Sequence, residues 1–188
     1  MKEIIIDVLI IGAGPSGCVA ASYLHNNNVN IKLVEKNKFP RFVIGESLLP
    51  RCMDHFEEVG LLDCLKERNY EKKEGARFIK GDVICEFDFS KKHGDGWDWT
   101  WQVQRADFDN TMAQELVKRG VDLSFEHEVI AVSFNKGIST TTIKDENGNN
   151  YTVKAKKIID SSGYGRVLPR LLDLSLPSQL PKHSSVFS

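Results

Sequence analysis

The stretch Ile4–Gly17, IIIDVLIIGAGPSG, decides the fold of this 188-residue chain. Its first half is apolar and β-branched almost throughout, which is typical of a parallel strand buried on both faces. Its second half, from Gly12 to Gly17, has the spacing GxGxxG and leads into residues 15–24, which contain no internal helix breaker. Residues 30–34, NIKLV, predict a second strand after that helix. We therefore expect a right-handed strand–helix–strand unit with two parallel strands.

The glycine spacing predicts a site for an ADP-containing dinucleotide at this turn. Gly12 permits the tight turn, Gly14 lets the backbone approach a diphosphate, and Gly17 lets helix and strand pack closely. Pro15 and Ser16 lie at the helix start, where unpaired N–H groups and the positive dipole end attract phosphate. Glu35 ends the second strand, at the interval where an acid reaches the ribose hydroxyls and disfavours a 2′-phosphate.

Composition narrows the class of protein. With 41% hydrophobic and 27% charged residues, the chain can bury one sizeable core. A net charge of -1 offers no electropositive excess, so we expect no nucleic-acid partner. The N-terminus is too short and polar for a signal peptide or membrane span, and the four cysteines form no CxxC pair. We therefore expect a cytoplasmic protein with reduced thiols, no membrane span and no metal site.

The rest of the chain predicts helices and antiparallel strands around the first unit. We expect helices at 48–59, 61–68 and 106–119. Strands at 76–80, 83–89 and 97–103 would form hairpins over the first unit, and strands at 122–125, 129–135, 138–145 and 151–154 a meander before a strand at 157–159. The fold class is thus α/β, with a Rossmann-like core at about 1–60, 104–130 and 155–165. A β-rich substrate-side segment spans about 70–103, and the small meander about 129–155.

A family resemblance rests on Arg41–Pro50, RFVIGESLLP, which is similar to a segment of the flavin-dependent halogenases. More broadly, the chain resembles the para-hydroxybenzoate hydroxylase superfamily, which includes geranylgeranyl reductases and aromatic monooxygenases. The resemblance implies FAD as the cofactor, with this segment beside the flavin. Arg41 could clamp a diphosphate oxygen. Glu46 and Ser47 could face the cofactor or simply cap the next helix.

Two later motifs extend the implied FAD site. Gln104–Asp109, QRADFD, resembles the family element whose arginine contacts FAD, which points to Arg105; the alternative is a surface ion pair. Asp160–Gly163, DSSG, resembles the strand-end motif whose aspartate meets the flavin, although Asp160 could instead cap the turn. We also expect Lys36 and Val129 to contact the cofactor.

Lys73 is the candidate catalytic residue, because KEGARF at 73–78 resembles the element that carries the halogenases' essential lysine. In that family the lysine receives hypohalous acid made at the flavin and presents halogen to the substrate. The alternative is that Lys73 belongs to a solvated charge run, EKKE. Trp97, Trp99 and Trp101 would alternate on one strand and share one face, either as core or as the lining of an aromatic substrate pocket.

The resemblance implies an FAD-dependent oxidoreductase, halogenase-like or monooxygenase-like, that acts on a small organic substrate. A separate flavin reductase would supply reduced flavin, since no second nucleotide motif is visible. One alternative is a geranylgeranyl-reductase-like dehydrogenase. Another is a non-catalytic fragment, because the superfamily usually has a further half with a Gly-Asp motif, and we expect that C-terminal half to be absent here.

Overall fold

The parallel sheet expected from the opening stretch is present in the computed structural model, which describes residues 3–182 and 184. Six strands lie in the order β7-β2-β1-β10-β9-β8. The strands of the chain are β1 Glu3–Ile11, β2 Ile31–Val34, β3 Glu71–Lys73, β4 Gly75–Lys80, β5 Val83–Asp88, β6 Thr100–Gln102, β7 Leu123–Ser124, β8 Glu128–Asn135, β9 Ile138–Lys144 and β10 Asn150–Asp160. The mixed α/β fold class is confirmed.

Strand β1 is central because it is paired on both edges, and from Val8 to Ile11 both of its faces are covered, whereas Ile5 near its start is exposed. It pairs in parallel with β2 and with β10, so that Ile11 lies between Val34 and Asp160. Val8 and Ile10 belong to one hydrophobic cluster, while Leu9 and Ile11 belong to another. Alternate side chains of a strand point to opposite faces, which explains why the apolar run is continuous.

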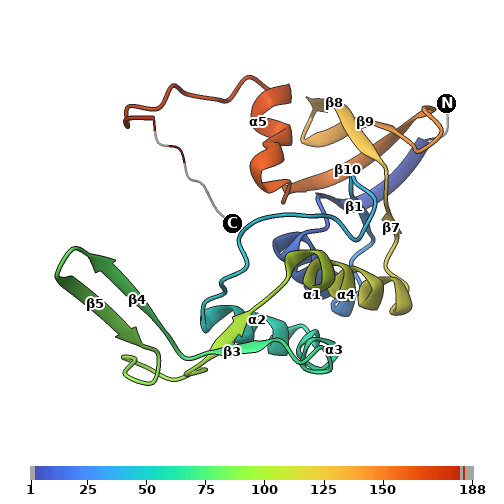
Figure 1. The fold of residues 1–188 in the computed structure, drawn as a ribbon. Coiled ribbons are helices and arrows are strands. Elements are labelled where there is room, and N and C mark those ends of the chain that lie inside the picture. Colours follow the sequence, from blue (N-terminus) through green and yellow to red (C-terminus); the bar gives the residue numbers. More distant parts are fainter. Residues whose placement is uncertain (1–2, 183, 185–188) are drawn as a thin grey trace.

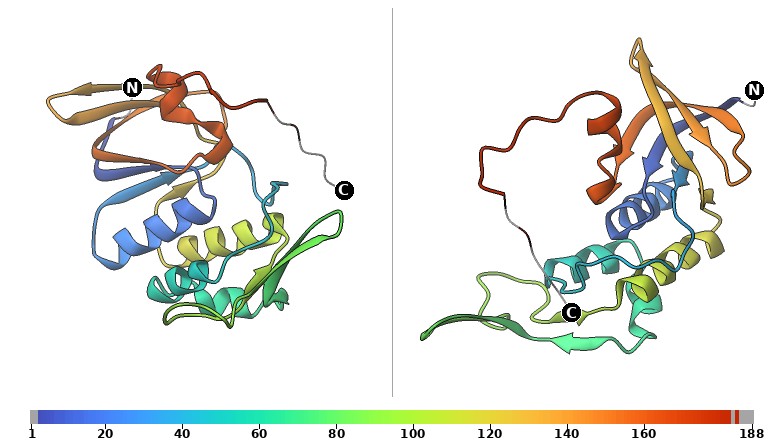
Figure 2. Two further views of the ribbon diagram at one scale, coloured as in Figure 1. Left: turned by 90° about the vertical axis from the view of Figure 1, so that its left-hand side faces the viewer. Right: turned by 45° about the horizontal axis from the view of Figure 1, so that its top comes forward.

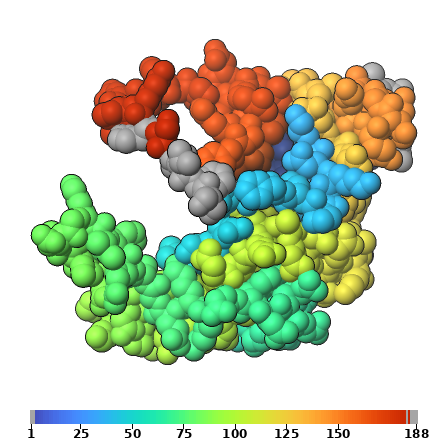
Figure 3. All heavy atoms as spheres, in the orientation of Figure 1, coloured from blue at the N-terminus to red at the C-terminus, as the bar shows by residue number. Residues whose placement is uncertain are grey.

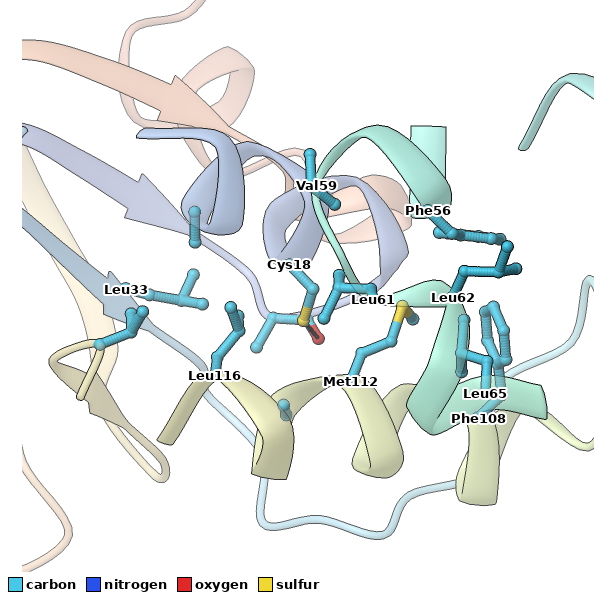
Figure 4. Packing of buried hydrophobic residues seen from close by; sticks show 14 of the residues in the cluster. Cys18, Leu33, Phe56, Val59, Leu61, Leu62, Leu65, Phe108, Met112 and Leu116 are labelled. Atoms are coloured by element: carbon cyan, nitrogen blue, oxygen red, sulfur yellow. Dashed lines mark hydrogen bonds between the residues drawn. The ribbon is translucent and has the colours of Figure 1, made fainter. Parts of the chain in front are cut away.

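Helices pack on both faces of the sheet: all but the last lie on one face, and the last lies on the other. They are α1 Pro15–Asn26, α2 Arg51–Glu58, α3 Leu62–Lys66, α4 Arg105–Lys118 and α5 Val167–Leu171, with a 3₁₀ turn at Gly163–Gly165. Figure 1 and both views of Figure 2 show α1 and α4 side by side on the same side of the sheet. Between them and α3 lie Cys18, Leu61, Met112 and Leu116, which are fully buried (Figure 4).

The opposite face of the sheet carries a smaller cluster. Val129, Ile143 and Val153 from β8, β9 and β10 pack here, and Val167 and Leu168 of α5 lie against them. The turn after β10 brings α5 back over this face (Figure 1). Both faces are therefore closed near the carboxyl ends of the parallel strands.

The β4–β5 hairpin stands apart from the sheet. Its strands pair only with each other, and every residue of β5 is exposed. Figure 3 shows this hairpin projecting from the rest of the surface. The expectation that it lies over the first unit is therefore wrong. Within residues 3–182 and 184, no helix is long and apolar enough to cross a membrane.

The expected break between residues 154 and 157 is also wrong, because β10 runs without interruption from Asn150 to Asp160. Two of the three lysines that disturb its apolar pattern are paired across the sheet. Lys154 lies 2.9 Å from Glu3, and Lys156 lies 2.6 Å from Asp7 of β1. The last three strands of the expected meander are consequently part of the main sheet, joined to it by β10. Its first strand, expected at 122–125, is not part of a meander, because β7 lies at the opposite edge of the sheet and pairs in parallel with β2.

Two further boundaries differ from expectation. Only Thr100–Gln102 of the expected strand at 97–103 is a strand, and it pairs with β3 rather than with the hairpin. Trp97 and Trp99 precede it, although their rings contact one another at 5.1 Å between centroids and Trp99 contacts Trp101 at 5.5 Å. Helix α2 begins at Arg51 instead of residue 48.

Candidate functional site

A cavity of about 650 Å³ lies where β1, β2 and β10 end and α1 begins. The carboxyl ends of parallel strands are the usual place for a ligand in such sheets. The residues that line it are Ile11, Gly12, Gly14, Pro15, Ser16, Val34, Glu35, Lys36, Asn37, Arg41, Val43, Ile44, Arg105, His127, Glu128, Val129, Ser161, Ser162, Gly163, Tyr164, Gly165, Val167 and Arg170.

The three glycines of the turn have different surroundings. Gly12 has a φ of +96°, and a Cβ there would lie 2.7 Å from the Ser161 carbonyl oxygen. A Cβ on Gly17 would lie 1.9 Å from the carbonyl oxygen of Gly12, so this position holds helix and strand together. Gly14 is different, because a Cβ there would meet nothing nearer than Arg41 Nη2 at 3.7 Å and Arg105 Nη2 at 3.9 Å.

The start of α1 is open to an anion. Gly14 is its N-cap, no side chain caps it, and its first turn contains no acidic residue. Pro15 occupies the first turn, where its missing N–H costs little. Backbone N–H groups and the positive end of the helix dipole are therefore available at the cavity wall.

Glu35 lines the cavity and also braces the glycine turn. Its side chain is buried, and one carboxylate oxygen accepts a hydrogen bond from the Ala13 N–H at 3.0 Å. The other oxygen accepts from the Asn37 N–H at 2.9 Å. The carboxylate thus fixes the turn between Gly12 and Gly14, a role the sequence did not reveal.

Arg41 and Arg105 reach the cavity from different elements. Arg41 lies in the loop after β2, with its guanidinium 4.4 Å from the Phe39 ring centroid, and Arg105 is the first residue of α4. Both side chains contact Asp109, which is fully buried. The alternative of a surface ion pair for Arg105 is wrong, since only 14% of its side chain is exposed.

Lys36 and Val129, which the sequence predicts to contact the cofactor, also lie in the cavity wall. The Lys36 ammonium lies 2.7 Å from a Glu128 carboxylate oxygen. Nine of the thirteen expected cofactor residues line the cavity; the four that do not are Gly17, Glu46, Ser47 and Asp160.

Asp160 and the Glu46–Ser47 pair have other contacts. The Asp160 carboxylate accepts hydrogen bonds from the N–H groups of Ser162 at 3.0 Å and Leu168 at 2.8 Å, so it organises the turn into α5. Neither Glu46 nor Ser47 caps α2, whose N-cap is Pro50 and which has no side-chain cap, so that alternative is wrong. Instead, the Glu46 carbonyl accepts from the Val103 N–H at 2.9 Å.

Lys73 lies in a second cavity of about 1020 Å³, between α2 and the β4–β5 hairpin. Its ammonium donates to Ser47 Oγ at 2.6 Å and to the Leu48 carbonyl at 3.1 Å. It also lies 5.2 Å from the Phe89 ring centroid. The neighbours Glu71 and Lys72 are exposed whereas Lys73 is half-buried, so Lys73 is not part of a uniformly solvated run.

The sequence missed several residues of the first cavity. His127 and Glu128 enter it from the start of β8, and residues 161–165 enter from the turn after β10. His127 is held between Tyr151 Oη at 2.7 Å and Glu146 at 2.9 Å. No motif marks His127 and Glu128, because only strand order brings them beside the glycine turn, whereas Ser161–Gly163 belong to the DSSG motif, of which only Asp160 was expected at the cofactor. Within the described ranges 3–182 and 184, no cluster of side chains could hold a metal ion.

Comparison with known proteins gives a consistent result. Residues 5–181 match the model of a family described as "FAD binding domain". A 1H-pyrrole-2-carbonyl-[peptidyl-carrier protein] chlorinase from Pseudomonas fluorescens is 29% identical over 186 residues, covering 89% of this chain and 41% of the relative. A flavoprotein/dehydrogenase structure from Cytophaga hutchinsonii is 51% identical with a TM-score of 0.89, covering 94% of this chain and 44% of that one. The myxobacterial chondrochloren halogenase CndH is 30% identical with a TM-score of 0.76, covering 84% and 37%. The chain thus spans less than half the length of each of these proteins.

Proposed function

We propose that this chain, which belongs to the FAD binding domain family, holds the FAD of a flavin-dependent oxidoreductase of the halogenase and monooxygenase branch. The cofactor of the family is FAD. The observation that carries the proposal is the open space over Gly14, walled by two arginine side chains at an uncapped helix start.

The residues of the first cavity fit FAD. The backbone at Gly14 can approach a diphosphate without a Cβ between them, and Arg41 and Arg105 supply fixed positive charge beside it. The Glu35 carboxylate would accept hydrogen bonds from the ribose hydroxyls of the adenosine, because its oxygens can accept more hydrogen bonds than they already do. Bound FAD would supply the oxidation–reduction chemistry, and this chain's residues bind it, orient it and balance its charge.

Lys73 is proposed as the catalytic residue of the longer protein. The cavity around it is lined by Phe78, Phe87, Phe89 and Trp97, which suits a small aromatic or otherwise unsaturated organic substrate. The contacts with Ser47 and Leu48 fix the ammonium within that cavity. Halogen transfer through a lysine needs such a fixed amine, and the halogenase relatives favour this chemistry over reduction of a polyprenyl double bond.

The partners we propose are a small organic substrate and a separate flavin reductase that delivers reduced flavin. The support for the reductase is the single nucleotide-binding motif, at residues 12–17. The four cysteines are free thiols, as a reducing compartment requires, which supports a cytoplasmic location.

The binding proposal is tested by adding FAD to the purified chain, desalting it and recording the flavin absorbance. We expect one FAD per chain to be retained and the released cofactor to be identified as FAD by mass. Retention of NAD in preference to FAD, or of neither, would contradict the proposal.

The catalytic proposal is tested in the longer protein with Lys73→Ala. We expect halide incorporation to be lost while FAD stays bound, because the ammonium lies outside the first cavity. Lys72→Ala is the matched control, since its side chain is exposed and pairs with Glu74. Unchanged turnover in Lys73→Ala would remove the residue from the mechanism.

A further inference from the structure

We propose that Asp109 is a positioning residue that aims both arginines, Arg41 and Arg105, at the diphosphate of the bound dinucleotide. This inference rests on the proposed function of the first cavity. Asp109 does not line that cavity, so it would act only through the two guanidinium groups.

The three side chains form one connected group. Asp109 Oδ1 accepts from Arg105 Nε at 2.8 Å, and Oδ2 accepts from Arg105 Nη2 at 3.0 Å, which is a two-point contact with one planar guanidinium. The same Oδ2 also accepts from Arg41 Nη1 at 2.9 Å. One carboxylate therefore sets the orientation of two cations that come from different elements.

The orientation of these cations places them over the glycine turn. Both Nη2 atoms are the nearest atoms to a Cβ built on Gly14. The Arg105 guanidinium is further fixed by the Gly45 carbonyl, which accepts from Nη1 at 3.2 Å. Apart from Asp109, the acid facing this group is Glu35, at 3.8 Å from Arg41 Nε.

Helix stability does not explain the contact. Arg105 opens α4, where a cation opposes the helix dipole, and it precedes Asp109 by four residues, the less favourable order for an ion pair. Asp109 is also fully buried, and a buried ion pair is weak evidence for stability because desolvation offsets the attraction. The arrangement instead holds the positive charges of Arg41 and Arg105 beside the first cavity.

The test compares Asp109→Asn with Asp107→Asn in the purified chain. Asp107 lies on the same helix and pairs with Arg68 at 3.0 Å, but outside the cavity. We expect the dissociation constants for FAD and ADP to rise at least tenfold in Asp109→Asn and less than twofold in the control. A change below twofold in Asp109→Asn would overturn the proposal.

A second comparison, made in a variant that lacks both arginines, tests whether Asp109 acts by positioning them or has a general structural role. In Arg41→Gln/Arg105→Gln, FAD binding is already weakened, and the buried carboxylate has lost its cations. Adding Asp109→Asn to this background should change the dissociation constant less than twofold, because the residue then has nothing to orient. A further tenfold loss would show that Asp109 acts by another route. If Asp109→Asn alone fails to fold because its arginines are left unpaired, the triple variant can still be measured, since it contains neither arginine.

A ligand-free readout keeps the two proposals distinguishable. In the nitrogen-15 NMR spectrum of the arginine side chains, the Arg105 Nε–H donates to Asp109 and should be resolved and slow to exchange with solvent. It should become averaged in Asp109→Asn and stay unchanged in Asp107→Asn. If the unaltered chain binds no FAD, the proposed function fails. A resonance that stays protected in Asp109→Asn overturns the positioning role itself.

Discussion

Replacing Gly14 by leucine should remove FAD binding while leaving the fold intact. Gly14 has φ of -71° and ψ of -177°, a conformation open to any residue. Its Cβ would have 3.7 Å to the nearest atom, which is ordinary contact. The added side chain would occupy the space that the diphosphate needs at the start of α1.

The expected change in the free energy of unfolding is smaller than the expected loss of FAD binding. Losing glycine at an N-cap costs about 1 kcal/mol. Reduced freedom of the unfolded chain returns about 0.4–1 kcal/mol, so the free energy of unfolding should change by less than about 1 kcal/mol. For binding we expect a loss of at least about 100-fold, which is about 2.7 kcal/mol.

Gly17→Ala is the contrasting variant. Its Cβ would lie 1.9 Å from the Gly12 carbonyl oxygen, and no side-chain rotation relieves a clash with backbone. Overpacking costs about 1–3 kcal/mol or more. FAD titration by fluorescence and urea unfolding by circular dichroism measure both quantities. The reasoning is refuted if Gly14→Leu binds FAD within twofold of the unaltered chain, or if Gly17→Ala unfolds at an unchanged urea midpoint.

Three further outcomes are expected. Met112→Ala should lower the free energy of unfolding by about 2–5 kcal/mol, seen in urea titration, because the side chain is fully buried and leaves a cavity. Burial acts to raise the pKa of Asp107, but the hydrogen bonds from Arg68 and Tyr70 and the charge of Arg68 together outweigh it and hold the pKa below 3.8. The stability gained is present above that value and lost as pH falls through the lower folded-state pKa, so Asp107→Asn should flatten the acid limb of a thermal unfolding profile. Iodoacetamide should label exposed Cys85 before Cys64, whose pKa burial raises to about 11, and timed mass spectrometry gives the order.

The elements best predicted from sequence are those specified by local signals. The opening strand, glycine turn and helix were correct because an apolar run, the GxGxxG spacing and an early proline act on neighbouring residues. The error at β10 has a physical cause. Its lysines disturb the apolar pattern, but Lys154 and Lys156 are paired with acids of β1, more than a hundred residues earlier in the chain.

The residues of the candidate site also divide into those predictable from local sequence and those that only the fold brings together. The residues within the glycine motif and the acid after β2 were predictable, and the DSSG motif marked the turn after β10, whereas His127 and Glu128 reach the cavity only through strand order. Asp109 resembles any helical acid in sequence, since it lies one residue beyond buried Phe108. Its burial and its two arginine partners become visible only once the loop at Arg41 packs against α4.

The pairing of β1 with β10 bears on how the protein is made. Residue 3 lies opposite residue 152, so during synthesis on the ribosome the first strand emerges long before its neighbour exists. Until then one edge of an apolar strand is unpaired and able to join a strand of another molecule. Contacts so distant in sequence also slow folding. Newly made chains should therefore depend on chaperones until the last strand of the sheet has been added.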